Sequence, residues 1–203
     1  MWWDWSGVLS DDRLPVYEAI MLVFGWLGHP GLSFQEFMDA AILPIMLFWW
    51  KFFPRLSKRE ADLLFKKAYA IVKSRPVMYE GADDVVRFLS AQGFKLMILS
   101  SYSEERLRAE AEAYGILDCF SKIVASAHYK WKAMGELTRH NGFNPRRTVF
   151  IGDMTHDVDT GRLAGVTTIA STYGYHSREK LQGSQPNYYI DHISQLIPII
   201  SAA

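Results

Sequence analysis

Three aspartates stand at the ends of apolar runs, or one helical turn beyond, where carboxylates could share a cation. Asp4 follows MWW, Asp153 follows TVFIG, and Asp157 comes four residues after Asp153. In an open α/β sheet, polar groups at the carboxyl ends of the strands gather at one rim. Carboxylates that converge there repel one another unless a cation lies between them, and Mg²⁺ is the usual ion where a phosphate also binds. The spacing therefore predicts a Mg²⁺ site formed by these residues.

Hydroxyl and ammonium groups follow two further apolar runs. Ser100 and Ser101 come after LMIL, and Lys130 and Lys132 come after SKIVAS. A serine can donate a hydrogen bond to a phosphoryl oxygen, and a lysine supplies positive charge beside a nucleophilic carboxylate. Together with Asp4 and the metal, these groups are the parts needed to transfer a phosphoryl group to an aspartate.

The two lysines compete for this role. Met134 and Leu137 lie four and seven positions after Lys130, so they would share a buried helix face with it. Counted from Lys132, the fourth position is Glu136, which fits a buried face less well. We therefore predict Lys130 as the lysine of the site.

The elements that must position these residues lie in two regions with different sequence patterns. Residues 14–76 are helical and aromatic, with capping boxes expected at Ser33 and Ser57 and one buried amphipathic helix over 40–50. After them, short apolar runs alternate with helices, which is typical of a parallel sheet covered on both faces. The expected fold is α/β: a Rossmann-like parallel-sheet core of residues 1–13 and 77–203, with an inserted α-helical domain of residues 14–76.

The alternation also predicts individual elements of the core. Five strands are expected within 1–4, 94–101, 121–126, 147–153 and 166–172, and helices within 81–93, 103–115, 131–142, 156–165 and 193–200. The segment TYGYHSREKL at 172–181 is interpreted as a surface loop. A position of its Gly174 and His176 beside the site is the alternative.

Composition restricts the partners and the compartment. The 203 residues contain 22 Lys+Arg and 22 Asp+Glu, so no basic field favours nucleic acid. The longest apolar run has eleven residues, whereas a membrane span needs about 20. No secretory signal is visible, and the single cysteine, Cys119, fits a reducing compartment. We expect a cytoplasmic protein without a nucleic-acid or membrane partner.

The quoted motifs resemble those of the haloacid dehalogenase superfamily, in its phosphoglycolate-phosphatase-like branch with a helical cap. DWSGVL is similar to the first motif, LMILSS to the second and IGDMTHDVDTGRLAGV to the fourth. The resemblance implies that Asp4 is the phosphate-accepting nucleophile and that Ser100 binds the phosphate. It also implies a Mg²⁺ site at Asp4, Asp153, Asp157 and the backbone carbonyl of Ser6.

Ser6 departs from the family pattern, which usually has a second aspartate there as general acid and base. An alcohol cannot shuttle that proton at neutral pH, and such proton transfer is typically worth about 10²–10⁴ in rate. The resemblance still favours a Mg²⁺-dependent phosphatase that hydrolyses a small phosphorylated metabolite through an aspartyl-phosphate. In that case water, His128 or His156 would replace the missing acid.

Two other functions stay open because of Ser6. One is a weak or inactive phosphate- and metal-binding regulatory protein on the same fold. The other is a phosphonatase-type hydrolase of a carbon–phosphorus bond, which would usually need a Schiff-base lysine from the cap. The candidates for that lysine are Lys51, Lys58, Lys66, Lys67 and Lys73.

The cap is unusually rich in aromatic residues at helical spacing. We interpret them first as core residues, and alternatively as a face that binds a second protomer in a homodimer or an apolar part of the substrate. These residues are Trp26, Phe48, Trp49, Trp50, Phe52 and Phe53.

Overall fold

The computed structural model describes residues 1–127, 129–140 and 143–201. The chain forms two compact units, one made of residues 1–11 with 78–203 and the other of residues 12–77. The first unit is an α/β domain and the second is helical, as the two sequence patterns predict. We call them the core unit and the helical unit.

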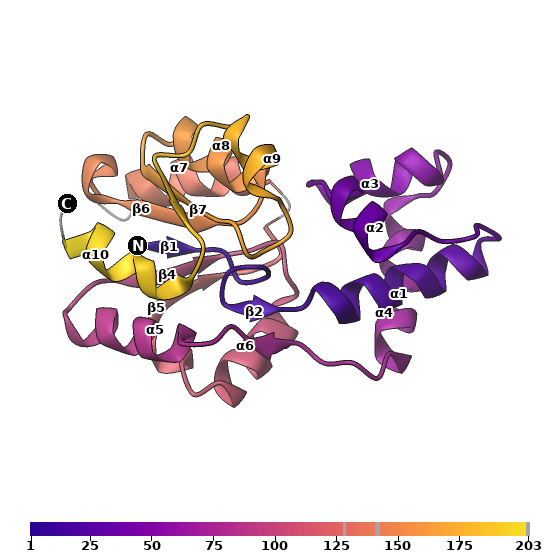
Figure 1. Ribbon diagram of the computed structural model, residues 1–203, viewed down its shortest axis with the longest axis horizontal. Helices are drawn as coiled ribbons and strands as arrows, with labels where there is room; N and C mark the ends of the chain where they lie inside the picture. Colours follow the sequence, from indigo (N-terminus) through magenta and orange to yellow (C-terminus); the bar gives the residue numbers. More distant parts are fainter. Residues whose placement is uncertain (128, 141–142, 202–203) are drawn as a thin grey trace. The chain divides into compact units, whose positions relative to one another are not determined.

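The core unit is built on a six-stranded parallel sheet with the order β5-β4-β1-β6-β7-β8 (Figure 1). Its strands are β1 (Trp2–Trp3), β4 (Leu96–Leu99), β5 (Phe120–Val124), β6 (Val149–Gly152), β7 (Thr167–Ser171) and β8 (Tyr188–Ile190). Strand β1 lies inside the sheet, with Trp3 opposite Ile98 of β4 and Ile151 of β6. A separate two-stranded sheet pairs β2 (Ser10–Asp11) with β3 (Val77–Met78).

Helices cover both faces of the six-stranded sheet (Figure 1). On one face lie α5 (Ala82–Ala91), α6 (Glu104–Ala113) and α10 (Leu196–Ser201), and on the other α7 (Lys130–His140), α8 (Thr155–Leu163) and α9 (Arg178–Gln182). Short 3₁₀ turns occupy Leu117–Cys119, Pro145–Arg147 and Ile193–Gln195. Because successive strand residues point to opposite faces, Trp3 packs into the first layer and Trp2 into the second. Both indoles are fully buried, so they anchor the short strand that leads to Asp4.

The helical unit contains α1 (Arg13–Trp26), α2 (Phe34–Ala40), α3 (Ile45–Phe52) and α4 (Lys58–Ile71). The predicted capping boxes are confirmed: the Ser33 and Ser57 hydroxyls accept hydrogen bonds from the backbone three residues on, and a glutamate returns the bond in each case. Aromatic rings make the interior of this unit. The ring of Phe24 lies 4.7–6.2 Å, between centroids, from those of His29, Phe48, Trp49, Phe52 and Phe53.

The expectation of one buried helix over residues 40–50 is wrong. Helix α2 ends at Ala40 and α3 begins at Ile45, with Pro44 as its N-cap. Proline has no N–H to continue a helix, and it disfavours helical backbone at the residue before it. Leu47 and Trp50 are 46% and 48% exposed, so α3 buries one face only.

The interpretation of residues 172–181 as a surface loop is also wrong. Gly174 and His176 are buried, and helix α9 begins at Arg178. The sixth strand, β8, was not predicted either, because its three residues are too few for a periodic pattern and Tyr188 is 45% exposed at the sheet edge. Within the described part of the chain, no helix has the length and apolar character needed to cross a membrane.

Candidate active site

Asp4 stands where β1 ends, and its carboxylate is held from two sides. Its N–H donates to the carbonyl of Ile151 at 2.9 Å, which continues the pairing with β6. The backbone N–H of Trp5 donates to Oδ1 at 2.7 Å, and the ammonium of Lys130 donates to Oδ2 at 2.5 Å. Asp4 is 3% exposed, so neither oxygen is freely hydrated. The carboxylate is therefore fixed in place before any ligand binds.

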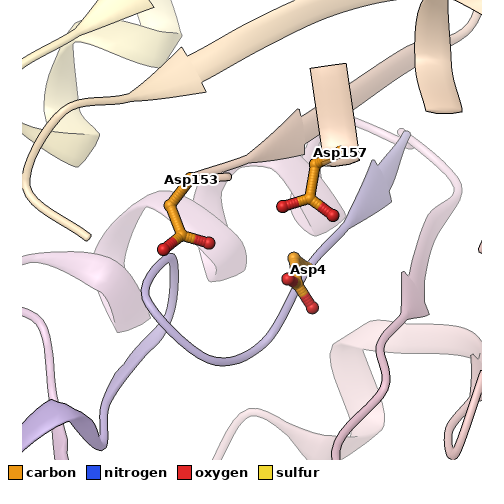
Figure 2. Close-up of side chains that lie close together, drawn as sticks. All are labelled: Asp4, Asp153 and Asp157. Carbon is orange, nitrogen blue, oxygen red and sulfur yellow. The ribbon is translucent and has the colours of Figure 1, made fainter. Parts of the chain in front are cut away.

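Asp153 and Asp157 approach from the neighbouring strand and helix (Figure 2). Asp153 follows β6, and Asp157 lies in the first turn of α8. Asp157 accepts hydrogen bonds from the Met154 N–H at 3.1 Å and from Lys130 Nζ at 2.7 Å. Each of the three aspartates is buried and offers an oxygen within 4.8 Å of the others. The structure thus brings together the three carboxylates that the sequence singles out.

The charges of this cluster shift its pKa values in different directions. Burial raises the pKa of Asp153 well above its ordinary value, and the neighbouring carboxylates raise it further. Burial also raises the pKa of Asp4, although Lys130 opposes that shift. At Asp157 burial is the largest single influence and acts in the same direction, but Lys130 and the neighbouring His156 together outweigh it and hold the pKa below its ordinary value. Burial works against the charged form of Lys130, yet Asp157 and Asp4 raise its pKa above the usual value.

A divalent cation fits the arrangement of Asp153. The N–H of Tyr175 donates to its Oδ2 at 2.7 Å, whereas the buried Oδ1 has no hydrogen-bond partner among the described residues. Three buried carboxylates face a single ammonium group, so the cluster has more negative than positive charge. A hard cation that prefers oxygen ligands, such as Mg²⁺, would satisfy the unpaired oxygen and balance this charge.

The structure separates the two candidate lysines. Lys130 is fully buried and contacts Asp4 and Asp157, and Met134 is buried on the same helix. Lys132 is exposed, with its ammonium 5.3 Å from the ring centroids of Tyr129 and Trp131. Lys130 is therefore the lysine at the carboxylate cluster.

The predicted serines lie on the loops beside Asp4. Ser100 follows β4 and is buried, and its Oγ accepts a hydrogen bond from the Tyr102 N–H at 3.3 Å. Its hydroxyl also hydrogen-bonds Asp4, which lowers the pKa of that carboxyl in part. Ser101, the next residue, is half-buried. Ser6 is half-buried in the turn after Asp4 and forms a β-bridge with Ser10.

Two histidines of this region were candidates for proton transfer. His156 is half-buried in the first turn of α8, and its Nδ1 lies 4.0 Å from an oxygen of Asp157. That distance is too long for a hydrogen bond. His128 lies outside the described residues.

The segment after β7 borders the site, as the alternative interpretation of Gly174 predicts. A Cβ on Gly174 would lie 2.4 Å from the Asp153 side chain and 2.5 Å from the carbonyl of Gly7, so only glycine fits without displacement. Ser171 and Tyr173 donate side-chain hydrogen bonds to the carbonyls of Gly7 and Val8, each at 3.2 Å. These contacts fix the turn after Asp4 against Asp153. The glycine after a strand end was the one sequence signal for them.

Comparisons with known proteins agree with this geometry. A family model described as haloacid dehalogenase-like hydrolase matches residues 2–171. A phosphoglycolate phosphatase from Synechococcus elongatus is 27% identical over 126 residues, covering 61% of this chain and 59% of that protein. One from Pseudomonas putida is 27% identical over 144 residues, covering 68% and 53%. The chain thus spans somewhat more than half the length of these curated relatives.

Solved structures share the fold. A haloacid dehalogenase-like family hydrolase from Streptococcus pneumoniae superposes with a TM-score of 0.86 at 21% identity, covering 98% of this chain and 96% of that one. At that identity the likeness concerns the fold alone. The family model covers most of the chain, including Asp4, Lys130, Asp153 and Asp157. The chain therefore belongs to the haloacid dehalogenase-like hydrolases.

Proposed function

We propose that the protein is a Mg²⁺-dependent phosphatase that hydrolyses a small phosphate monoester through an aspartyl-phosphate on Asp4. The observation that carries this proposal is the buried Lys130, which contacts Asp4 and Asp157 at 2.5 and 2.7 Å beside an unpaired oxygen of Asp153. The relatives named phosphoglycolate phosphatase support the same reaction class.

Each residue has a role that follows from its position. Asp4 attacks phosphorus, so an O–P bond forms to its carboxylate while the ester P–O bond breaks and the alcohol leaves. Lys130 and Ser100 stabilise the negative charge of the phosphoryl oxygens. Water then attacks phosphorus, which releases inorganic phosphate and restores the Asp4 carboxylate. Mg²⁺, held by Asp4, Asp153, Asp157 and the carbonyl of Ser6, would supply the positive charge that lets an anionic phosphate approach these carboxylates.

Because residue 6 is a serine, protonation of the leaving alcohol oxygen becomes the difficult step of the reaction. A carboxylic acid at this position would protonate the leaving oxygen, whereas a serine hydroxyl is too weak an acid at neutral pH. In this chain the proton would come instead from water, His128 or His156. We therefore expect p-nitrophenyl phosphate, whose phenolate leaves without a proton, to react much faster than an alkyl phosphate.

The test is release of phosphate from p-nitrophenyl phosphate by wild type and by Asp4→Asn, with Mg²⁺ and with EDTA. We expect release by wild type with Mg²⁺, and a loss of at least about 10⁴-fold in the variant, which lacks the nucleophile. Full activity of Asp4→Asn, or activity that EDTA leaves unchanged, would disprove the mechanism.

Ser6 also favours a second candidate function, in which the protein binds phosphate and metal without turnover. A Ser6→Asp variant separates the two. A gain of about 10²–10⁴ in rate over wild type would mean that the site is competent and lacks only its acid. Absence of activity in both proteins, with binding of Mg²⁺ and phosphate retained, would support the binding role.

The structure gives no support to a carbon–phosphorus hydrolase. A Schiff-base lysine needs a desolvated or electropositive environment that lowers its pKa. All five candidate lysines of the helical unit, at positions 51, 58, 66, 67 and 73, are exposed on that unit.

The aromatic residues of the helical unit divide into two groups. Phe48 and Trp49 are buried, whereas Trp26 and Trp50 are 41% and 48% exposed. We propose the exposed pair as part of a homodimer face in a cytoplasmic protein. Sedimentation of wild type and a Trp26→Gln/Trp50→Gln variant tests this, because a monomeric wild type would contradict it.

A further inference from the structure

The carboxylate of Glu110, in the middle of α6, receives three hydrogen bonds from three side chains. Its Oε2 accepts from Trp5 Nε1 and from Ser10 Oγ, both at 2.8 Å, and its Oε1 accepts from the Tyr102 hydroxyl at 2.7 Å. Glu110 itself is half-buried, while the Trp5 and Ser10 side chains are fully buried. Hydrogen bonds to a carboxylate are stronger than those between neutral groups. The Glu110 carboxylate therefore holds its three partner side chains in fixed orientations.

Two of the three partners of Glu110, Trp5 and Tyr102, also hold the two phosphate-site side chains. The backbone N–H of Trp5 donates to the Asp4 carboxylate at 2.7 Å, and the backbone N–H of Tyr102 donates to Ser100 Oγ at 3.3 Å. Both residues thus bind the site through their main chain and Glu110 through their side chain. One carboxylate links the loop after β1 to the loop after β4.

Further contacts keep this link from rotating. The Trp5 ring stacks on Tyr114 with centroids 5.9 Å apart and planes 13° apart. The Tyr114 hydroxyl lies 3.0 Å from Ser10 Oγ, and Arg106 lies over the Tyr102 ring at 5.0 Å. Each side chain that Glu110 binds is therefore also fixed by a second contact.

We infer that Glu110 is a positioning residue that sets the separation between the Asp4 carboxylate and the Ser100 hydroxyl. The inference rests on the proposed function, since it concerns how nucleophile and phosphate donor are aligned for the same phosphoryl group. A displacement of about 1 Å can cost 10²-fold in rate. Loss of the shared carboxylate should therefore lower kcat more than it raises KM.

The variants Glu110→Ala and Glu110→Gln test this position. Glutamine can accept from Trp5 and Ser10 through its carbonyl and donate to the Tyr102 hydroxyl through its amide, so it can preserve the three contacts. Alanine removes all of them. The matched control is Glu112→Ala, which removes an exposed glutamate two residues on in the same helix.

With p-nitrophenyl phosphate and Mg²⁺, we expect kcat to fall about 10- to 100-fold in Glu110→Ala, with KM within about threefold of wild type. Glu110→Gln should restore most of kcat, and Glu112→Ala should match wild type. The Trp5 indole N–H resonance, identified in ¹⁵N NMR spectra by its loss in Trp5→Phe, should move upfield in Glu110→Ala and stay near its place in Glu110→Gln. An unchanged kcat in Glu110→Ala, or a loss that glutamine does not restore, would overturn the inference.

If wild type releases no phosphate, that result contradicts the proposed function but does not yet test the role of Glu110. The same variants are then compared by calorimetric titration with inorganic phosphate in the presence of Mg²⁺. Weaker phosphate binding in Glu110→Ala that Glu110→Gln restores supports the positioning role. Equal affinity in all variants, or a wild type that does not bind phosphate, overturns it.

Discussion

The two units of this protein contain lysine–aspartate pairs of almost the same length in opposite surroundings. In the core unit, Lys130 Nζ lies 2.5 Å from an Asp4 oxygen, and the two side chains are 0% and 5% exposed. In the helical unit, Lys58 Nζ lies 2.6 Å from an Asp62 oxygen, and those side chains are 51% and 53% exposed. Distance alone therefore does not tell what a pair does. Its surroundings decide whether it is a functional constraint or a surface contact.

The same contrast extends to the interiors of the units. All residues of the helical unit, 12–77, are described, and Asp12 at its start is their one buried charged residue, since aromatic rings fill the interior. The core unit buries three carboxylates and an ammonium group at the carboxyl ends of its strands. Burying charge costs folding free energy unless the groups pair or coordinate a metal. In the core unit, Lys130 pairs with Asp4 and Asp157 and so offsets part of that cost.

The largest effect is expected from Lys130→Met, which leaves the three carboxylates without their buried counter-charge. Breaking a buried ion pair from one side costs about 3–5 kcal/mol of unfolding free energy, and phosphate release should be lost as well. Urea unfolding measures the first and a phosphate assay the second. Lys132→Met is the control, because this lysine is exposed and should change stability by less than about 0.5 kcal/mol. Equal losses of stability and activity in Lys130→Met and Lys132→Met would contradict the view that the buried lysine differs from the exposed one.

Gly174→Ala should have a smaller effect, which acts through packing rather than charge. The new Cβ would overlap the Asp153 side chain at 2.4 Å and force the turn at Gly7 to move. Overpacking of this kind costs about 1–3 kcal/mol, and the displaced Asp153 should weaken Mg²⁺ binding. Thermal unfolding and calorimetry give the two readouts.

The matched control for that substitution is Gly183→Ala, where the nearest atom would lie at an ordinary 3.5 Å. It should keep the wild-type Mg²⁺ affinity. If Gly174→Ala also keeps it, the segment after β7 does not support Asp153.

The smallest effect is expected from Lys58→Met in the helical unit. An exposed pair four residues apart on a helix is worth about 0.3–0.5 kcal/mol, and salt screens it. Urea unfolding at low and high salt checks this. A loss comparable to that of Lys130→Met would show that burial is not what separates the two pairs.

Much of the core could be predicted from sequence because its strands are short, apolar and bounded by helices. The predicted runs 1–4, 94–101, 147–153 and 166–172 contain β1, β4, β6 and β7, and the run 121–126 overlaps β5. Strand β8 has only three residues at the sheet edge, so packing rather than local pattern defines it. Over 40–50 the apolar pattern favoured one helix, but the missing N–H of Pro44 divides it.

At the site, the sequence indicated the charged side chains but not the hydrogen-bond donors and acceptors that position them. Asp4 and Asp153 follow neighbouring strands and Asp157 lies in the helix directly after Asp153, so their meeting is a consequence of sheet topology. The N–H donor of Tyr175 is a backbone group and has no side-chain signature. Glu110 is one of several glutamates on a charged helix, and only the fold shows that it accepts three hydrogen bonds.

Calorimetric titration with Mg²⁺ tests most directly whether the three buried aspartates form a cation site. Wild type should bind one Mg²⁺. Asp153→Asn should bind it at least about tenfold more weakly, since even outer-shell partners of a metal contribute that much to affinity. Asp159→Asn, which replaces an aspartate with a 47% exposed side chain on the same helix as Asp157, should match wild type. A wild type without Mg²⁺ binding, or an Asp153→Asn variant with unchanged affinity, would contradict the account.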